Sequence, residues 1–243
     1  MTASPLESLS QSAYQAIKEK ILRGGFPLGT SLSRRKLATM LGTSQLTVSV
    51  ALRQLESDGL VETKARAGTR VRIPRPADIR DSYILREALE TQAARLFVRN
   101  ATAEQRRELR RMAEHTDILF NRCTGGETDP EFLYEVHSYH LEFHMRIAQC
   151  CGSQALMHAL EKNQVLIFNW LFDVAVHHQS RPPRSHRELM EVLCGADLEA
   201  ADRATRKHIQ YGLEEMIGAI TGRTSEKWRE RSTAESRSLA KHI

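Results

Sequence analysis

The sequence predicts a mainly α protein in two parts, an N-terminal winged helix-turn-helix domain and a C-terminal all-α antiparallel bundle of about six helices. Two observations predict this fold class. Residues 33–73 read as two short helices joined by a tight turn and followed by a small two-stranded hairpin. From residue 78 onward, apolar residues recur at helical spacing almost throughout. The 243 residues are enough for two domains with cores of their own.

Capping residues and glycines define the N-terminal elements. Ser33 is placed to cap a short helix that Gly42 ends, and Ser44 opens the next helix, which Gly59 closes. The expected elements are helices over 8–23, 34–41 and 43–59, and strands over 60–63 and 69–73 on either side of a basic turn.

Glycines and prolines also divide the rest of the chain into helices. We expect these over 78–99, 102–121, 130–150, 153–177, 184–194 and 197–221. The expected domain organisation is a winged helix-turn-helix domain over 1–74, a linker over 75–80, a helical domain over 81–222, and a charged, Ser-rich tail over 223–243 that is expected to be frayed or disordered.

Positive charge is concentrated in the N-terminal part. Residues 1–76 hold 12 Lys or Arg and 5 Asp or Glu, a formal charge of +7, whereas the remainder carries −2. That distribution is typical of a segment that binds phosphates. The N-terminus lacks the pattern of a signal peptide and no apolar run is long enough to span a membrane, so we expect a soluble, cytoplasmic protein.

The four cysteines, Cys123, Cys150, Cys151 and Cys194, show no Cys-x-x-Cys spacing. They are interpreted as reduced thiols in or near the core. A redox or metal role for the adjacent Cys150 and Cys151 is the alternative.

A helix, a turn, a second helix and a wing place one helix in a DNA major groove. Residues in the first turn of that helix reach base edges, and a Gln there can pair with adenine through two hydrogen bonds. Arginines on both helices are placed for phosphates, and a Gly at the wing tip allows close approach to the minor groove. The candidate DNA-contacting residues are Arg34, Arg35, Ser44, Gln45, Thr47, Ser49, Arg53, Arg66 and Gly68. The alternative is that they are merely solvated side chains.

These motifs together resemble the GntR family of bacterial transcription regulators, in the FadR-like branch whose C-terminal ligand-binding domain (FCD) is all-helical. The resemblance extends over nearly the whole chain, and the order and spacing of the motifs carry it. It rests on Leu32-x-x-Arg35-x-Leu37-Ala38, Leu41-Gly42-Thr43-Ser44, Gly59-Leu60-Val61 and Gly68-Thr69-x-Val71, and then on Leu85-Arg86-x-x-Leu89-Glu90, Phe143-His144-x-x-Ile147, His186-Arg187-x-Leu189 and Ala201 leading to His208.

The second helix of the DNA-binding unit departs from the family pattern. That pattern is usually Ser-Arg-x-Pro-Val-Arg-Glu-Ala-Leu, whereas this chain has Ser44-Gln45-Leu46-Thr47-Val48-Ser49-Val50-Ala51-Leu52. Both arginines, the Pro and the Glu are missing. We therefore expect an operator that differs from the family's common one, with readout richer in A·T at the Gln45 position.

Four of the ten histidines form a candidate metal site. His140 and His144 are four residues apart on a predicted helix, so both rings project from one face and can converge on one ion. The resemblance implies a divalent metal held by three histidines and an Asp or Asn. His144, His186 and His208 match the three histidines, and His140 stands where the family has Asp or Asn.

A set of four neutral imidazoles favours Zn²⁺, or else Ni²⁺, over harder ions such as Mn²⁺. The alternative is that all four are core histidines with their hydrogen bonds satisfied. The other six match nothing in the family pattern and are interpreted as surface or local hydrogen-bonding residues. A zinc-protease helix would need His-Glu-x-x-His, but Leu141 follows His140.

The resemblance further implies a small organic acid as effector, coordinated at the metal. Arg86 matches a conventional cavity arginine, which could clamp the carboxylate by two parallel hydrogen bonds. An intrahelical pair with Glu90, four residues later, is the alternative. Arg146 and Asn169 are further effector-binding candidates.

Together these inferences predict a ligand-responsive bacterial transcription regulator, a repressor by family default. It would bind a palindromic double-stranded operator as a homodimer. Two alternatives stay open. One is a DNA-binding regulator whose metal is structural or absent and whose effector does not need it, and the other is a metalloenzyme fused to a DNA-binding domain.

Overall fold

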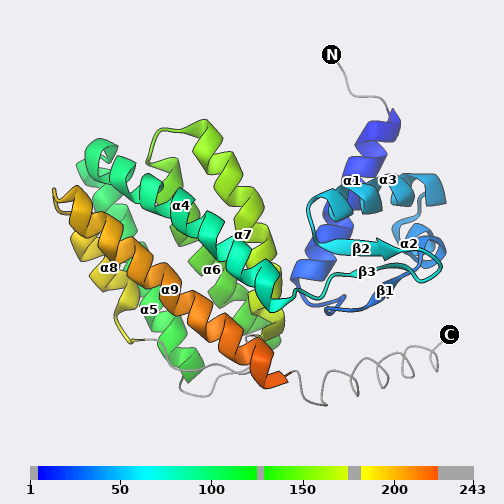
Figure 1. Ribbon diagram of the computed structural model, residues 1–243. Coiled ribbons are helices and arrows are strands. Elements are labelled where there is room, and N and C mark those ends of the chain that lie inside the picture. Colours follow the sequence, from blue (N-terminus) through cyan, green and yellow to red (C-terminus); the bar gives the residue numbers. More distant parts are fainter. Residues whose placement is uncertain (1–4, 125–128, 175–181, 224–243) are drawn as a thin grey trace. The chain divides into compact units, whose positions relative to one another are not determined.

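The computed structural model describes residues 5–124, 129–174 and 182–223 of the chain (Figure 1). Two compact units make up the structure, and the division falls after Ile73. The first is a winged helix-turn-helix unit and the second is helical, as the sequence predicts.

The N-terminal unit combines three helices with a small antiparallel sheet. Its elements are α1 (Pro5–Leu22), β1 (Ser31–Leu32), α2 (Arg34–Leu41), α3 (Gln45–Ser57), β2 (Val61–Lys64) and β3 (Gly68–Val71). The strand order is β1-β3-β2, with Ser31 opposite Arg70 and Glu62 opposite the same arginine on its other side. The sequence prediction missed β1, because a strand of two residues is too short to show an alternating pattern.

Local signals at the helix ends are confirmed. The Ser33 side chain caps α2 by accepting a hydrogen bond from the backbone N of Lys36, and Gly42 ends that helix in the left-handed region at φ 61°. Ser44 caps α3 in the same way, accepting from the backbone N of Thr47. Behind these caps, α1 packs on α3 around fully buried side chains, among them Ile17, Val48 and Leu55. Each such side chain contributes about 1.5–3 kcal/mol by leaving water.

Six helices form the second unit among the described residues: α4 (Pro76–Asn100), α5 (Ala103–Thr124), α6 (Pro130–Gln149), α7 (Gln154–Val174), α8 (Ser185–Leu193) and α9 (Leu198–Arg223). The predicted linker over 75–80 is wrong for all but its first residue, since α4 already begins at Pro76. Proline suits a first helical turn, and the Asp78 carboxylate accepts from the backbone N of Arg75 at 2.8 Å. The predicted tail lies outside the described residues beyond Arg223.

The helices pack so that α5 contacts both α6 and α8, and α4 contacts α6, α7 and α8 (Figure 1). Phe97, Leu109 and Phe143, one each from α4, α5 and α6, are completely buried in one core with Ala201 of α9. This core brings α4, α5, α6, α8 and α9 around a common interior. Within the described ranges, no helix is both long enough and apolar enough to cross a membrane.

Candidate metal centre and nucleic-acid interface

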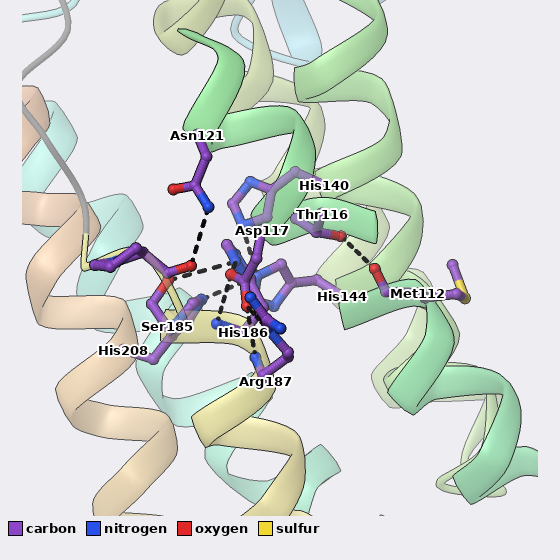
Figure 2. Close-up of polar contacts among 11 residues, drawn as sticks. Met112, Thr116, Asp117, Asn121, His140, His144, Ser185, His186, Arg187 and His208 are labelled. Carbon is purple, nitrogen blue, oxygen red and sulfur yellow. Dashed lines mark hydrogen bonds and ion pairs between the residues drawn. The ribbon is translucent and has the colours of Figure 1, made fainter. Parts of the chain in front are cut away.

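Four imidazoles from three helices converge inside the helical unit (Figure 2). His140 and His144 come from α6, His186 from α8 and His208 from α9. One ring nitrogen of each lies within 4.8 Å of the corresponding nitrogens of the others. Nε2 of His144 is 2.9 Å from Nε2 of His140 and 3.3 Å from Nε2 of His208. The rings of His140 and His144 therefore converge on one face of α6, as their helical spacing predicts.

These residues fit a divalent metal of the zinc type. Zn–N bonds of about 2.0–2.1 Å in a tetrahedron separate the nitrogens by about 3.3–3.4 Å, close to the spacing of the His144 contacts. His140, His144 and His186 are buried, and His208 is partly exposed. Phe120 stacks on the His186 ring at 5.5 Å between centroids, so an apolar wall borders the cluster. The donor set therefore could hold one ion.

Glu90 of α4 orients the His144 ring. Its Oε2 lies 2.8 Å from Nδ1 of His144, while its Oε1 accepts from Nε of Arg86 at 2.5 Å and from Nε2 of Gln164 at 2.6 Å. Burial alone would raise the pKa of Glu90, but Arg86 and His144 outweigh it and lower the pKa to about 2. An ionised Glu90 favours a proton on Nδ1 of His144, which leaves the Nε2 lone pair toward the other histidines.

Asp117 of α5 does the same for His186, and it also caps a helix (Figure 2). Its Oδ1 lies 2.8 Å from Nδ1 of His186 and accepts from the backbone N of that residue at 3.1 Å. Its Oδ2 accepts from both the backbone N and Nε of Arg187. Burial would raise the pKa of Asp117, but the hydrogen bonds from His186 outweigh it and hold the pKa below its ordinary value. A carboxylate behind a metal-binding histidine is a recurrent arrangement.

The sequence prediction missed both orienting roles. Asp117 and His186 are 69 positions apart on different helices, and no spacing rule connects them. The sequence indicates Glu90 only as a partner of Arg86. Of the two interpretations of His137, surface or local hydrogen-bonding residue, the first is wrong, because His137 is buried and packs edge-on against Phe120.

The effector-binding candidates lie in different surroundings. Arg86 is buried beside the cluster, with Nη2 3.4 Å from Nε2 of His144, but it makes the intrahelical pair with Glu90 that the sequence left open. The guanidinium of Arg146 is instead bound to both carboxylate oxygens of Glu108 at 2.8 Å, so the structure does not bring it to the histidines. Asn169 belongs to α7, but its side chain lies outside the described part of the chain.

On the recognition helix α3, the structure separates the candidate base-contacting residues. Gln45 is exposed, whereas Thr47 is 2% exposed and packs into the core. The Thr47 hydroxyl contacts that of the cap residue Ser44 at 2.9 Å. The Ser49 hydroxyl donates to the Gln45 carbonyl at 2.7 Å. The expected base contact of Thr47 is therefore corrected: its side chain belongs to the helix cap and the core.

The arginines that the sequence analysis assigns to DNA phosphates all lie at the surface. Arg34, Arg35 and Arg53 are exposed on α2 and α3. Arg66 and Gly68 mark the wing turn and both have positive φ, 65° and 80°. That conformation is strained for arginine and natural for glycine, and it gives the turn its tight reversal.

Cys123, Cys150, Cys151 and Cys194 form no disulfide bond, and the first three are buried. Burial raises the pKa of the Cys150 thiol, which disfavours the reactive thiolate.

Comparison with known proteins agrees with this architecture. Residues 9–71 match the gntR family of bacterial regulatory proteins, and residues 81–211 match the FCD domain. The chain is 25% identical to the HTH-type transcriptional regulator YdhC of Bacillus subtilis, over 84% of this chain and 88% of that protein. It is 22% identical to the HTH-type transcriptional repressor RspR of Escherichia coli, over 85% and 88% respectively.

Solved structures share the fold. A GntR transcriptional regulator from Rhodococcus sp. RHA1 superposes with a TM-score of 0.72 at 20% identity, covering 87% of this chain and 99% of that one. E. coli McbR/YncC superposes with a TM-score of 0.67, also at 20% identity, covering 90% of this chain and all of that one. YdhC, RspR and the Rhodococcus protein are described as transcriptional regulators. The chain is therefore a transcriptional regulator of the GntR family, in the FadR-like branch with an N-terminal GntR helix-turn-helix domain and a C-terminal FCD domain.

Proposed function

We propose that this regulator responds to a small carboxylate effector, and that it does so through a divalent metal, most simply Zn²⁺ with Ni²⁺ as the alternative, held by His140, His144, His186 and His208. The four-histidine cluster inside the FCD domain carries the proposal. Its nitrogen-only donor set suits these ions. When bound, such an ion supplies a positive centre for an anionic ligand.

In this proposal, residues around the cluster orient the metal-binding imidazoles and bind the effector. Glu90 and Asp117 fix the two imidazoles His144 and His186. Arg86 is the effector-binding candidate that the geometry favours, because its guanidinium reaches to 3.4 Å from His144. A carboxylate that competes with Glu90 for Arg86 would reach the cluster directly.

DNA is held by the winged helix-turn-helix unit, with Gln45 toward base edges and Arg34, Arg35, Arg53 and Arg66 toward phosphates. A palindromic operator implies a two-fold symmetric homodimer. We propose that the effector and the operator prefer different arrangements of the dimer, and that the short segment between β3 and α4, residues 72–75, transmits the difference. A coupling free energy of about 1–3 kcal/mol changes operator affinity about 5–150-fold. The relative RspR is described as a transcriptional repressor, which supports repression as the regulatory outcome.

A purely structural role for the metal is the second candidate. Four histidines would fill a tetrahedral zinc site completely, which is typical of structural zinc and leaves no position for an effector. The effector-binding candidate Arg86 is also already paired with Glu90. On this account the metal stabilises the helical domain and the effector binds without it.

The experiment starts from an operator selected from random duplex DNA with the full chain. Operator affinity is then measured by fluorescence anisotropy for metal-free protein, for Zn²⁺-loaded protein, and for loaded protein with each of a panel of small mono- and dicarboxylates. The proposal expects at least one acid to shift affinity about 5–150-fold in the loaded wild type and not in His144→Ala. An equal shift in both proteins would favour the structural metal, and no shift with any acid would contradict a carboxylate-responsive regulator.

A further inference from the structure

Few side chains of the recognition helix are available to read bases, because its hydroxyl groups form hydrogen bonds within the helix. The Ser44 hydroxyl accepts a hydrogen bond from the backbone N–H of Thr47 and contacts the Thr47 hydroxyl, and the Ser49 hydroxyl donates to the carbonyl of Gln45. Hydroxyl groups bound within the helix have less capacity for base edges. In the first turn, the side chains that extend into solvent are those of Gln45 and Leu46.

Leu46 is the apolar member of that pair. Its side chain is 61% exposed. Among the described large apolar side chains of the N-terminal unit, this is the highest exposure. At about 100° per residue it lies roughly 180° around α3 from the fully buried Leu55, so it points directly away from the core. Arg53, seven residues later, lies within about 20° of the same line and is also exposed.

A single exposed leucine usually needs no explanation, but the position of this one matters. The first turn of a recognition helix is where side chains meet base edges in the major groove. Thymine is the base that presents a methyl group there, and an apolar side chain is its natural partner. The cationic Arg53 on the same line is placed for a phosphate farther along the groove.

We propose that Leu46 is a specificity-determining residue that contacts the C5-methyl group of a thymine, beside an adenine read by Gln45. The proposal rests on the DNA-binding function of the helix-turn-helix unit and deepens it. It assigns sequence readout to one amide and one aliphatic side chain. The preferred half-site therefore contains A·T pairs where α3 enters the groove.

The test removes only the methyl group. A half-site is selected from random duplex DNA with the full chain, and each thymine is then replaced in turn by deoxyuridine, which pairs identically but lacks the C5-methyl. We expect one or two replacements to weaken wild-type binding about fourfold, the affinity ratio that corresponds to one buried methylene-sized group. Leu46→Ala is expected to bind the thymine and deoxyuridine operators equally.

A matched control is Leu9→Ala, which shortens another exposed leucine of the same unit on α1. It should keep the wild-type difference between thymine and deoxyuridine. The proposal is overturned if no deoxyuridine replacement weakens wild-type binding, or if Leu46→Ala keeps the wild-type sensitivity. Failure to select any sequence over competitor DNA would overturn sequence-specific DNA binding itself, and with it this proposal. Circular dichroism checks that each variant is folded.

Discussion

The carboxylate of Asp117 lies 2.8 Å from Nδ1 of His186 and at the same time accepts the backbone N–H groups that open α8. Arg184, the residue at the usual cap position of α8, makes no side-chain cap bond. One buried side chain of α5 therefore fixes both the start of α8 and the orientation of the imidazole that α8 contributes to the histidine cluster.

Asp117→Asn removes the negative charge that raises the basicity of the His186 ring. Asn has only one acceptor oxygen, so its NH2 group would face donors that Asp117 now accepts. We expect thermal stability to fall, and Zn²⁺ affinity measured by chelator competition to fall about 10–100-fold. Asp197→Asn is the matched control, since Asp197 accepts the backbone N–H groups of Glu199 and Ala200 at the start of α9. Asp117→Asn with wild-type zinc affinity would contradict the orienting role.

Glu90→Leu should destabilise the metal-free protein strongly. It removes the buried partner of Arg86 and leaves a desolvated guanidinium, which typically costs about 3–5 kcal/mol. The double variant Arg86→Leu/Glu90→Leu removes both charges and should recover part of that loss. Urea unfolding in the presence of a chelator compares the three proteins. If the double variant were no more stable than Glu90→Leu, the buried charge would not be the cause.

The exposed arginines predict how DNA binding responds to salt. Each phosphate that an arginine neutralises adds about 0.9 to the slope of log affinity against log salt. Arg34→Ala, Arg35→Ala, Arg53→Ala and Arg66→Ala should each reduce the magnitude of that slope by about 1. Arg23→Ala is the control, because Arg23 of α1 pairs with Glu19. A slope unchanged in all four variants would remove these phosphate assignments.

Gln45 and Thr47 should behave differently despite their proximity. Gln45→Ala is expected to relax the preference for adenine, worth about 1–3 kcal/mol against the wrong base. Thr47→Val keeps the buried shape and should leave base preference unchanged, while the lost hydroxyl contact with Ser44 costs about 0.5–1.5 kcal/mol of stability. Parallel operator selections with the two variants check this. Altered base preference in Thr47→Val would restore the base contact that its burial argues against.

The raised pKa of Cys150 predicts slow alkylation. A thiol with a raised pKa is more fully protonated at a given pH, and the protonated form is the unreactive one. At pH 8 we expect iodoacetamide to modify the partly exposed Cys194 well before Cys150, and all four cysteines to react in denaturant. Mass spectrometry of digested protein follows each site. Equal rates at Cys150 in native and denatured protein would revive a redox role for this residue.

The sequence predicts those features that local chemistry determines. Ser33, Gly42 and Ser44 mark helix ends through their own backbone contacts, and the spacing of His140 and His144 places two rings on one face. These predictions need no knowledge of the tertiary fold.

What the sequence does not reveal depends on packing between helices. Asp117 meets His186 only because α5 lies against α8, and the burial of Thr47 depends on how α3 sits on the core. The sequence left open whether Arg86 pairs with Glu90 or awaits a ligand, and the buried pair is what the structure shows. The two-residue strand β1 exists only through its partner β3.

Metal content tests the proposed histidine site without any assumption about DNA or effector. It is measured on full-length protein purified without a histidine tag, beside His144→Ala and the control His158→Ala, which changes an exposed histidine. We expect about one equivalent of Zn²⁺ or Ni²⁺ per chain in the wild type and in His158→Ala, and its loss in His144→Ala. If none of the three proteins held metal, even after incubation with Zn²⁺ and Ni²⁺, the four histidines would not form a metal site.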